Sequence, residues 1–160
     1  MKFYTGVGSR KTPTHILKLM QQIASKLAHE GWTLRSGAAH GADQAFERGC
    51  RGNAEVYLPW PFFNSHKSHL CRPTEAAYDV ARLYHPTWDR LKYGGQKLMA
   101  RNTHQVLGAD MKTPSKFVIC WHQGTGGTTQ ACRIAIAHSI PVFNLNNAAT
   151  RQRLEAWLNA

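Results

Sequence analysis

Acidic side chains are scarce in this chain of 160 residues. Nine Asp and Glu stand against twenty Lys and Arg, which gives a formal net charge of +11 at pH 7 and an isoelectric point near 9.9. Such an excess of one sign bears on partners rather than on fold, and it favours phosphates, nucleic acid or another anionic surface. A highly soluble protein with a positive surface and no such partner is the alternative.

Long apolar runs and paired cysteines are missing as well. No stretch approaches the ~20 apolar residues of a membrane span, and residues 1–6 lack the anatomy of a secretory signal, so we expect no membrane partner. The four cysteines, Cys50, Cys71, Cys120 and Cys132, are scattered without a CxxC motif. Because Cys120 and Cys132 lie in apolar or helical stretches, we interpret both as core thiols and expect a reducing, cytoplasmic compartment.

The composition, 42% hydrophobic and 18% charged, excludes disordered, collagen-like and disulfide-framework classes. One cluster, His66, His69 and Cys71, offers metal-ligand types, but no fourth ligand follows at the usual spacing and Lys67 would repel a cation. We therefore expect a solvated basic loop there, no metal and no cofactor.

Short apolar strands alternate with helical stretches along the chain. We expect strands at residues 3–7, 32–35, 55–58, 116–121 and 141–145, and helices at 13–30, 43–50, 74–84, 96–107, 130–138 and 150–158. Thr12 is the expected N-cap of the first helix. This alternation predicts an α/β fold: a single three-layer domain over residues 1–160, with a mainly parallel sheet of about five strands. Residues 62–86 form an irregular insertion inside it.

Three loops of small residues each follow a strand and open a helix. They are Gly6–Arg10, Ser36–Asp43 and Gly124–Thr129. In a parallel sheet these loops meet at the carboxyl edge, where free helix N–H groups favour phosphate and small residues allow close approach. Taken alone, the first loop is equally compatible with an ordinary turn, and Asp43 is more simply explained as the cap of its own helix.

Three segments resemble signatures of the DprA/Smf family: Val7–Arg10, Ser36–Asp43 and Met99–Asn102. That family belongs to a superfamily of Rossmann-like nucleotide-binding domains that also contains the Lonely Guy phosphoribohydrolases. The resemblance spans Phe3 to Leu145 apart from the insertion. It implies a Rossmann-like fold, a nucleotide or DNA-phosphate site at the carboxyl edge, and self-association as a homodimer. Full-length DNA-processing members carry extra domains, for which this chain has no room.

The loops and the resemblance together indicate a set of phosphate-binding candidates. These are Gly8, Ser9, Arg10, Ser36, Gly37, Ala38, His40, Gly41, Asp43, Arg101, Asn102, Gly124, Thr125, Gly126, Gly127, Thr128 and Thr129. Trp60, Phe62 and Phe63 follow the third strand and so flank the same edge, where Trp60 is a candidate for stacking on a base. Its alternative role is to cover the core or a dimer contact.

The phosphoribohydrolase branch adds an arginine and a glutamate that follows the Gly/Thr loop. Arg101 matches that arginine, but the loop here continues Thr128-Thr129-Gln130-Ala131-Cys132, and no acid lies between Asp110 and Glu155. Cleavage of an N-glycosidic bond passes through a cationic sugar that needs a carboxylate beside it. Asp43 is the one acid in the three loops, so the catalytic candidates are Asp43 and Arg101.

These observations favour a stand-alone DprA-like protein that binds single-stranded DNA or nucleotide phosphates. A nucleoside-monophosphate N-glycoside hydrolase is the first alternative, supported by Arg101. A sensor or sequestering protein for a small nucleotide signal is the second.

Overall fold

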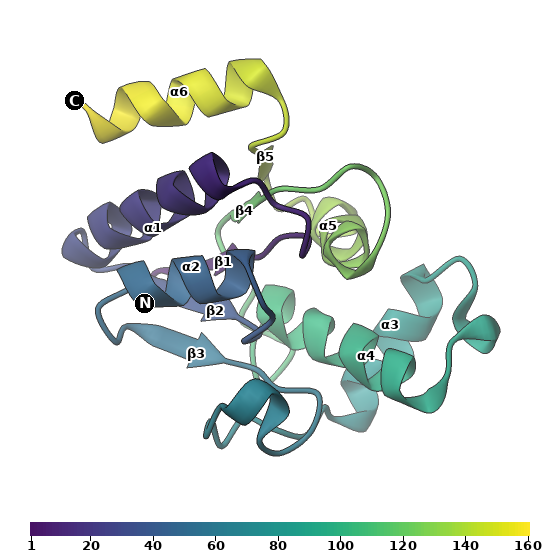
Figure 1. The fold of residues 1–160 in the computed structure, drawn as a ribbon. Coiled ribbons are helices and arrows are strands. Elements are labelled where there is room, and N and C mark those ends of the chain that lie inside the picture. Colours follow the sequence, from purple (N-terminus) through teal and green to yellow (C-terminus); the bar gives the residue numbers. More distant parts are fainter.

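The strands all run parallel in one sheet, in the order β3-β2-β1-β4-β5. The computed structural model describes residues 1–160 (Figure 1). The strands are β1 (Phe3–Gly6), β2 (Thr33–Ser36), β3 (Ala54–Val56), β4 (Val118–Cys120) and β5 (Val142–Asn144). The helices are α1 (Thr14–His29), α2 (Ala42–Gly49), α3 (Glu75–Tyr84), α4 (Tyr93–Leu107), α5 (Gly127–Ala137) and α6 (Ala148–Leu158), with single 3-10 turns at η1 (Phe63–Ser65) and η2 (Trp88–Arg90).

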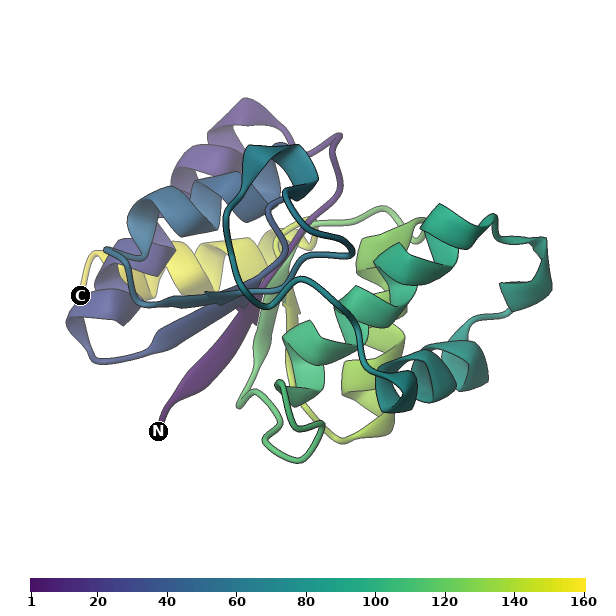
Figure 2. The same ribbon diagram turned by 90° about the horizontal axis from the view of Figure 1, so that it is seen from below.

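The helices cover both faces of the sheet. α1, α2 and α6 lie on one face and α4 and α5 on the other, while α3 packs on the outside of α4 and α5 (Figures 1 and 2). The predicted Rossmann-like three-layer fold with a parallel five-stranded sheet is therefore confirmed. No helix is both long enough and apolar enough to cross a membrane.

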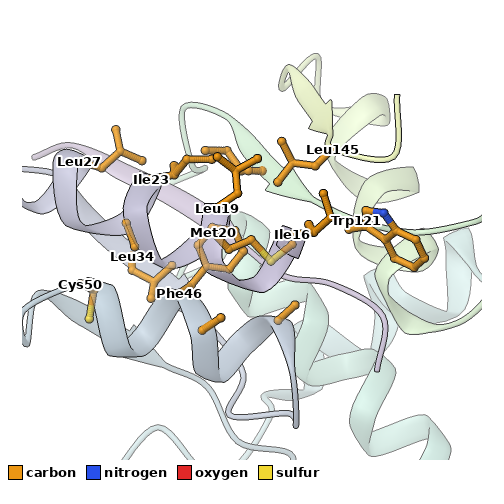
Figure 3. Close-up of a cluster of buried hydrophobic side chains, with 14 of the residues drawn as sticks. Ile16, Leu19, Met20, Ile23, Leu27, Leu34, Phe46, Cys50, Trp121 and Leu145 are labelled. Carbon is orange, nitrogen blue, oxygen red and sulfur yellow. The ribbon is translucent and has the colours of Figure 1, made fainter. Parts of the chain in front are cut away.

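The larger core lies between the sheet and α1. Ile16, Met20, Ile23 and Leu27 recur at helical spacing, so they form one apolar stripe that packs on β-sheet and α2 side chains such as Phe46 (Figure 3). Burying each such side chain contributes roughly 1.5–3 kcal/mol.

A second core lies on the opposite face, under α4 and α5. β4 contributes to both cores, because Ile119 faces the first while Val118 and Cys120 face the second. This explains why β4 is apolar at every position, as expected for a central strand of a parallel sheet.

The starts of α1 and α5 differ from the sequence prediction. Thr12 does not cap α1: its hydroxyl donates to the Ser9 carbonyl at 2.5 Å, and Pro13 occupies the cap position without a side-chain bond. α5 begins inside the Gly/Thr loop, with Gly126 as its N-cap. Glycine has no side chain that can form a capping hydrogen bond, so the sequence pattern predicted the start of α5 too late, at residue 130 instead of Gly127.

Candidate functional site

A cavity of about 500 Å³ opens at the carboxyl edge of the sheet, between the loops that follow β1 and β4. The chain leaves β1 toward β2 on one side, whereas β4 pairs with β1 on the other. Parallel α/β sheets bind ligands outside such a reversal point, because neighbouring loops separate there. The fold therefore produces the crevice at the edge that the sequence indicated.

Most of the candidate residues line this cavity. The structure brings together Gly8, Ser9, Arg10, His40, Asp43, Arg101, Asn102, Thr125, Gly126, Gly127 and Thr128. Ser36, Gly37, Ala38, Gly41, Gly124, Thr129 and Trp60 are not part of the lining.

The Gly/Thr loop presents the start of α5 to the cavity. Gly126 caps the helix with a φ of +88°, a left-handed conformation that favours glycine, and no side chain accepts a bond from the first turn. The N–H groups of that turn keep their partial positive charge, so they can receive an anion.

Arg101 enters the cavity from α4 and is almost completely buried. Its Nη1 donates to the carbonyls of Gly37 and Tyr57 at 2.5 and 3.2 Å, and its Nε donates to Asn102 Oδ1 at 2.9 Å. No protein acceptor is bound to Nη2, so a guanidinium donor is left for a ligand. Burial lowers the pKa of Arg101 to about 10, which leaves it charged at neutral pH.

Gly37 explains why Arg101 can lie so deep. A Cβ at this position would lie 2.6 Å from Arg101 Nη1, too close for any real side chain. Gly37 therefore acts by making room for the arginine, not by lining the cavity.

Asp43 lies opposite Arg101, on the first turn of α2. Its carboxylate accepts the Ala39 N–H at 3.2 Å, and burial raises its pKa from 3.8 to about 6 against the opposing effects of Arg101 and nearby backbone N–H groups. The prediction that Asp43 caps its own helix is wrong. Gly41 occupies the cap position, and the carboxylate turns back onto the preceding loop.

Gln105 is a cavity residue that the sequence analysis missed. Its side chain is buried, and its Nε2 has no hydrogen-bond partner. An unpaired buried donor costs roughly 1–3 kcal/mol, so this atom indicates a missing polar partner. The available signal was its spacing: Gln105 is one helical turn after Arg101 and thus shares its face.

The insertion also contributes two lining residues, Phe63, which the sequence placed at this edge, and Asn64, which it did not indicate. Asn64 Nδ2 donates to the Ala38 carbonyl at 2.9 Å, which fastens this segment to the second loop. The Arg101 guanidinium lies 5.4 Å from the centroid of the Phe63 ring. The irregular pattern of residues 62–73 indicated neither the Asn64 hydrogen bond nor the contact of Phe63 with Arg101.

Two candidates outside the lining have other contacts. Ser36 is buried and donates its hydroxyl to the Gly6 carbonyl at 2.6 Å, so it joins the ends of β2 and β1. Trp60 is partly exposed and packs edge-to-face on Phe63 with a centroid distance of 5.3 Å. Its indole therefore lies beside a residue of the cavity wall.

Sequence comparisons identify no relative: no protein-family model and no curated protein matches the chain. A solved structure does match, that of DNA processing protein A from Helicobacter pylori, a protein that binds single-stranded DNA. The match has 13% identity and a TM-score of 0.59, and it covers 99% of this chain and 79% of that one. The chain therefore has a DprA-like fold.

Proposed function

We propose that the protein binds single-stranded DNA by receiving backbone phosphate in the cavity. One observation carries the proposal: Arg101 and Gln105, whose Nη2 and Nε2 donors have no protein partners, line the same cavity as the uncapped start of α5. Such donors suit phosphate oxygens, which accept without donating. The net charge of +11 and the single-stranded DNA binding of the protein with the same fold support this choice.

Trp60 fits the same proposal at the cavity rim. Trp60 packs on Phe63, a residue of the cavity wall, so its exposed ring is available to a base next to a phosphate that lies in the cavity. Stacking of a base on such a ring is worth roughly 1–3 kcal/mol and is tolerant of sequence.

The decisive variant is Gly126→Asp. The added carboxylate would repel phosphate at the start of α5, and we expect a loss of affinity for a labelled oligodeoxythymidine of about tenfold or more by fluorescence anisotropy. Gly52→Asp is the matched control, because Gly52 also has a positive φ and open space around it but lies in the turn before β3. Equal affinity of the two variants would place the DNA site elsewhere.

A second function, N-glycosidic cleavage of a nucleotide, is favoured by one observation. Asp43 and Arg101 line one cavity, and a carboxyl with a pKa of about 6 is suited to proton transfer near neutrality. Gln130 does not replace the family's glutamate: it is buried away from the cavity, and its Nε2 donates to the Ala81 carbonyl at 3.0 Å.

We expect no release of free base from ribo- or deoxyribonucleoside monophosphates, measured by chromatography. The reason is electrostatic, because no carboxylate follows the Gly/Thr loop to stabilise a cationic sugar. Release that disappears in Asp43→Asn and persists in Asp79→Asn, which alters an exposed α3 carboxylate, would make the protein a hydrolase with a relocated acid.

A further inference from the structure

Three metal-ligand side chains converge behind the Gly/Thr loop. Cys120 ends β4, His122 follows two residues later, and Cys132 faces them from α5, the helix that packs on this strand (Figure 1). Their ligand atoms all lie within 4.8 Å of one another, and the two Sγ atoms are 3.7 Å apart. Both cysteines are buried, whereas His122 is partly exposed.

The separation of the two sulfur atoms, 3.7 Å, matches that of a tetrahedral metal centre. Zn–S bonds of ~2.3 Å at a tetrahedral angle place two sulfur atoms ~3.8 Å apart. The thiols therefore already have the spacing that a shared ion requires, without movement of β4 or α5.

We propose that Cys120, His122 and Cys132 bind a thiolate-preferring divalent cation, Zn²⁺ by its chemistry, with the fourth position open to water. Binding releases the two thiol protons to solvent; the two thiolates then neutralise the ion and the neutral imidazole supplies the third ligand, so the charge is compensated inside the apolar core under α5. The partly exposed His122 provides the path by which the ion enters.

Loading also affects the Gly/Thr loop. His122 Nδ1 accepts the Gly124 N–H at 2.9 Å. A metal on Nδ1 displaces that bond, and a metal on Nε2 moves the ring proton to Nδ1, which then cannot accept. Either geometry releases the Gly124 N–H at the first residue of the loop, so metal binding and the loop conformation are coupled.

The test uses the reduced, purified protein titrated with Co²⁺ and then Zn²⁺. We expect one equivalent of Co²⁺ to produce a thiolate-to-cobalt charge-transfer band and tetrahedral ligand-field bands, which Zn²⁺ abolishes. Zn²⁺ should also slow alkylation of Cys120 and Cys132 but not of Cys71, and shift the amide resonance of Gly124.

Cys132→Ser and His122→Gln should each weaken Zn²⁺ binding by about tenfold or more. Cys71→Ser, which removes a thiol outside the cluster, should bind as the wild type does. His122→Gln keeps the proposal testable if the buried cysteine variant fails to fold, because His122 lies in a partly exposed loop.

Absence of the cobalt bands would overturn the proposal, as would unchanged binding in His122→Gln. If the reduced protein does not bind Zn²⁺ but forms a Cys120–Cys132 disulfide with glutathione disulfide, the proposal is also overturned and the two cysteines are a redox pair instead. The DNA proposal does not require the metal, so the two proposals fail independently.

Discussion

Burial rather than mutual attraction sets the protonation of the two charges that face each other in the cavity. Desolvation raises the pKa of Asp43 to about 6 and lowers that of Arg101 to about 10, while each partner's charge opposes the other's shift. Both groups are therefore ionised at neutral pH, and acid neutralises the carboxylate first. The cavity then gains one net positive charge.

Asp43 makes a specific contribution to the pH dependence of stability. Its pKa is higher in the folded protein than its value of 3.8 in the unfolded chain, so the folded state binds the proton first as pH falls. As the pH falls from about 6 to about 4, the free energy of unfolding therefore rises by up to ~1.4 kcal/mol per pH unit.

Asp43→Asn should remove this increment. Urea unfolding of the variant and the wild type across that pH range should show a stability difference that changes with pH. Asp79→Asn, which alters an exposed carboxylate, should show no such change. Parallel pH profiles for Asp43→Asn and the wild type would contradict the assignment.

At the scale of elements, one histidine joins the start of α3 to the end of α4. His104 Nε2 accepts the Thr74 N–H at 3.1 Å, and its Nδ1 donates to the Gly108 carbonyl at 2.9 Å. This bond pattern requires the neutral Nδ1–H tautomer, in agreement with the lowering of its pKa by burial. α4 carries Arg101, so this junction also supports the cavity.

Thr74 caps α3 by accepting the Ala77 N–H at 3.3 Å. Thr74→Ala should lower the free energy of unfolding by about 1 kcal/mol, because a donor of the first turn loses its acceptor. Chemical denaturation measures this loss. Thr87→Ala is the control, since Thr87 precedes η2 without accepting a capping bond. A similar loss in both variants would show that the cap contributes nothing.

Helices and strands were predictable where the sequence pattern that specifies them is local. The predicted strands and helices are all present, because apolar period and turn residues depend on near neighbours. α4 begins earlier than predicted, at Tyr93, and includes Gly94 and Gly95. A Cβ added to Gly94 would lie 3.9 Å from the Trp60 ring. An aromatic residue far away in the sequence therefore packs beside this first turn, which the two glycines alone did not indicate as helix.

At the scale of the whole molecule, the charge of +11 predicts a salt-dependent interaction with single-stranded DNA. The logarithm of affinity should fall against the logarithm of salt concentration with a slope of about −0.7 per phosphate contact. Anisotropy titrations of an oligonucleotide over a salt series measure this slope. A flat response would exclude the DNA proposal and leave a small nucleotide as ligand.

Arg10 distinguishes a localised site from diffuse charge. It is exposed and lines the cavity, whereas Arg153 is exposed on α6. Arg10→Ala should reduce the salt slope by about 0.7, and Arg153→Ala, which removes the same charge, should leave it unchanged. Equal effects would indicate that net charge alone attracts the DNA.

The sequence by itself determined the α/β class, the parallel sheet and the edge at which the site lies. These follow from local periodicity and from one direction of all strands, which brings the loops after β1, β2 and β4 to the same edge. Arg10, Asp43 and the Gly/Thr loop were therefore expected at this edge from the chain alone, whereas Arg101, which lies on α4, became a candidate through the resemblance to the DprA/Smf signatures.

Only the tertiary structure decided which side of each loop faces the cavity and which residues contact one another there. α4 packs on β1 and β2, and this brings Arg101 and Gln105 against Gly37 and turns Ser36 into the protein. The contact of Cys120 with Cys132 likewise depends on how α5 packs on β4. Such contacts join residues far apart in the chain, and packing alone determines their distance.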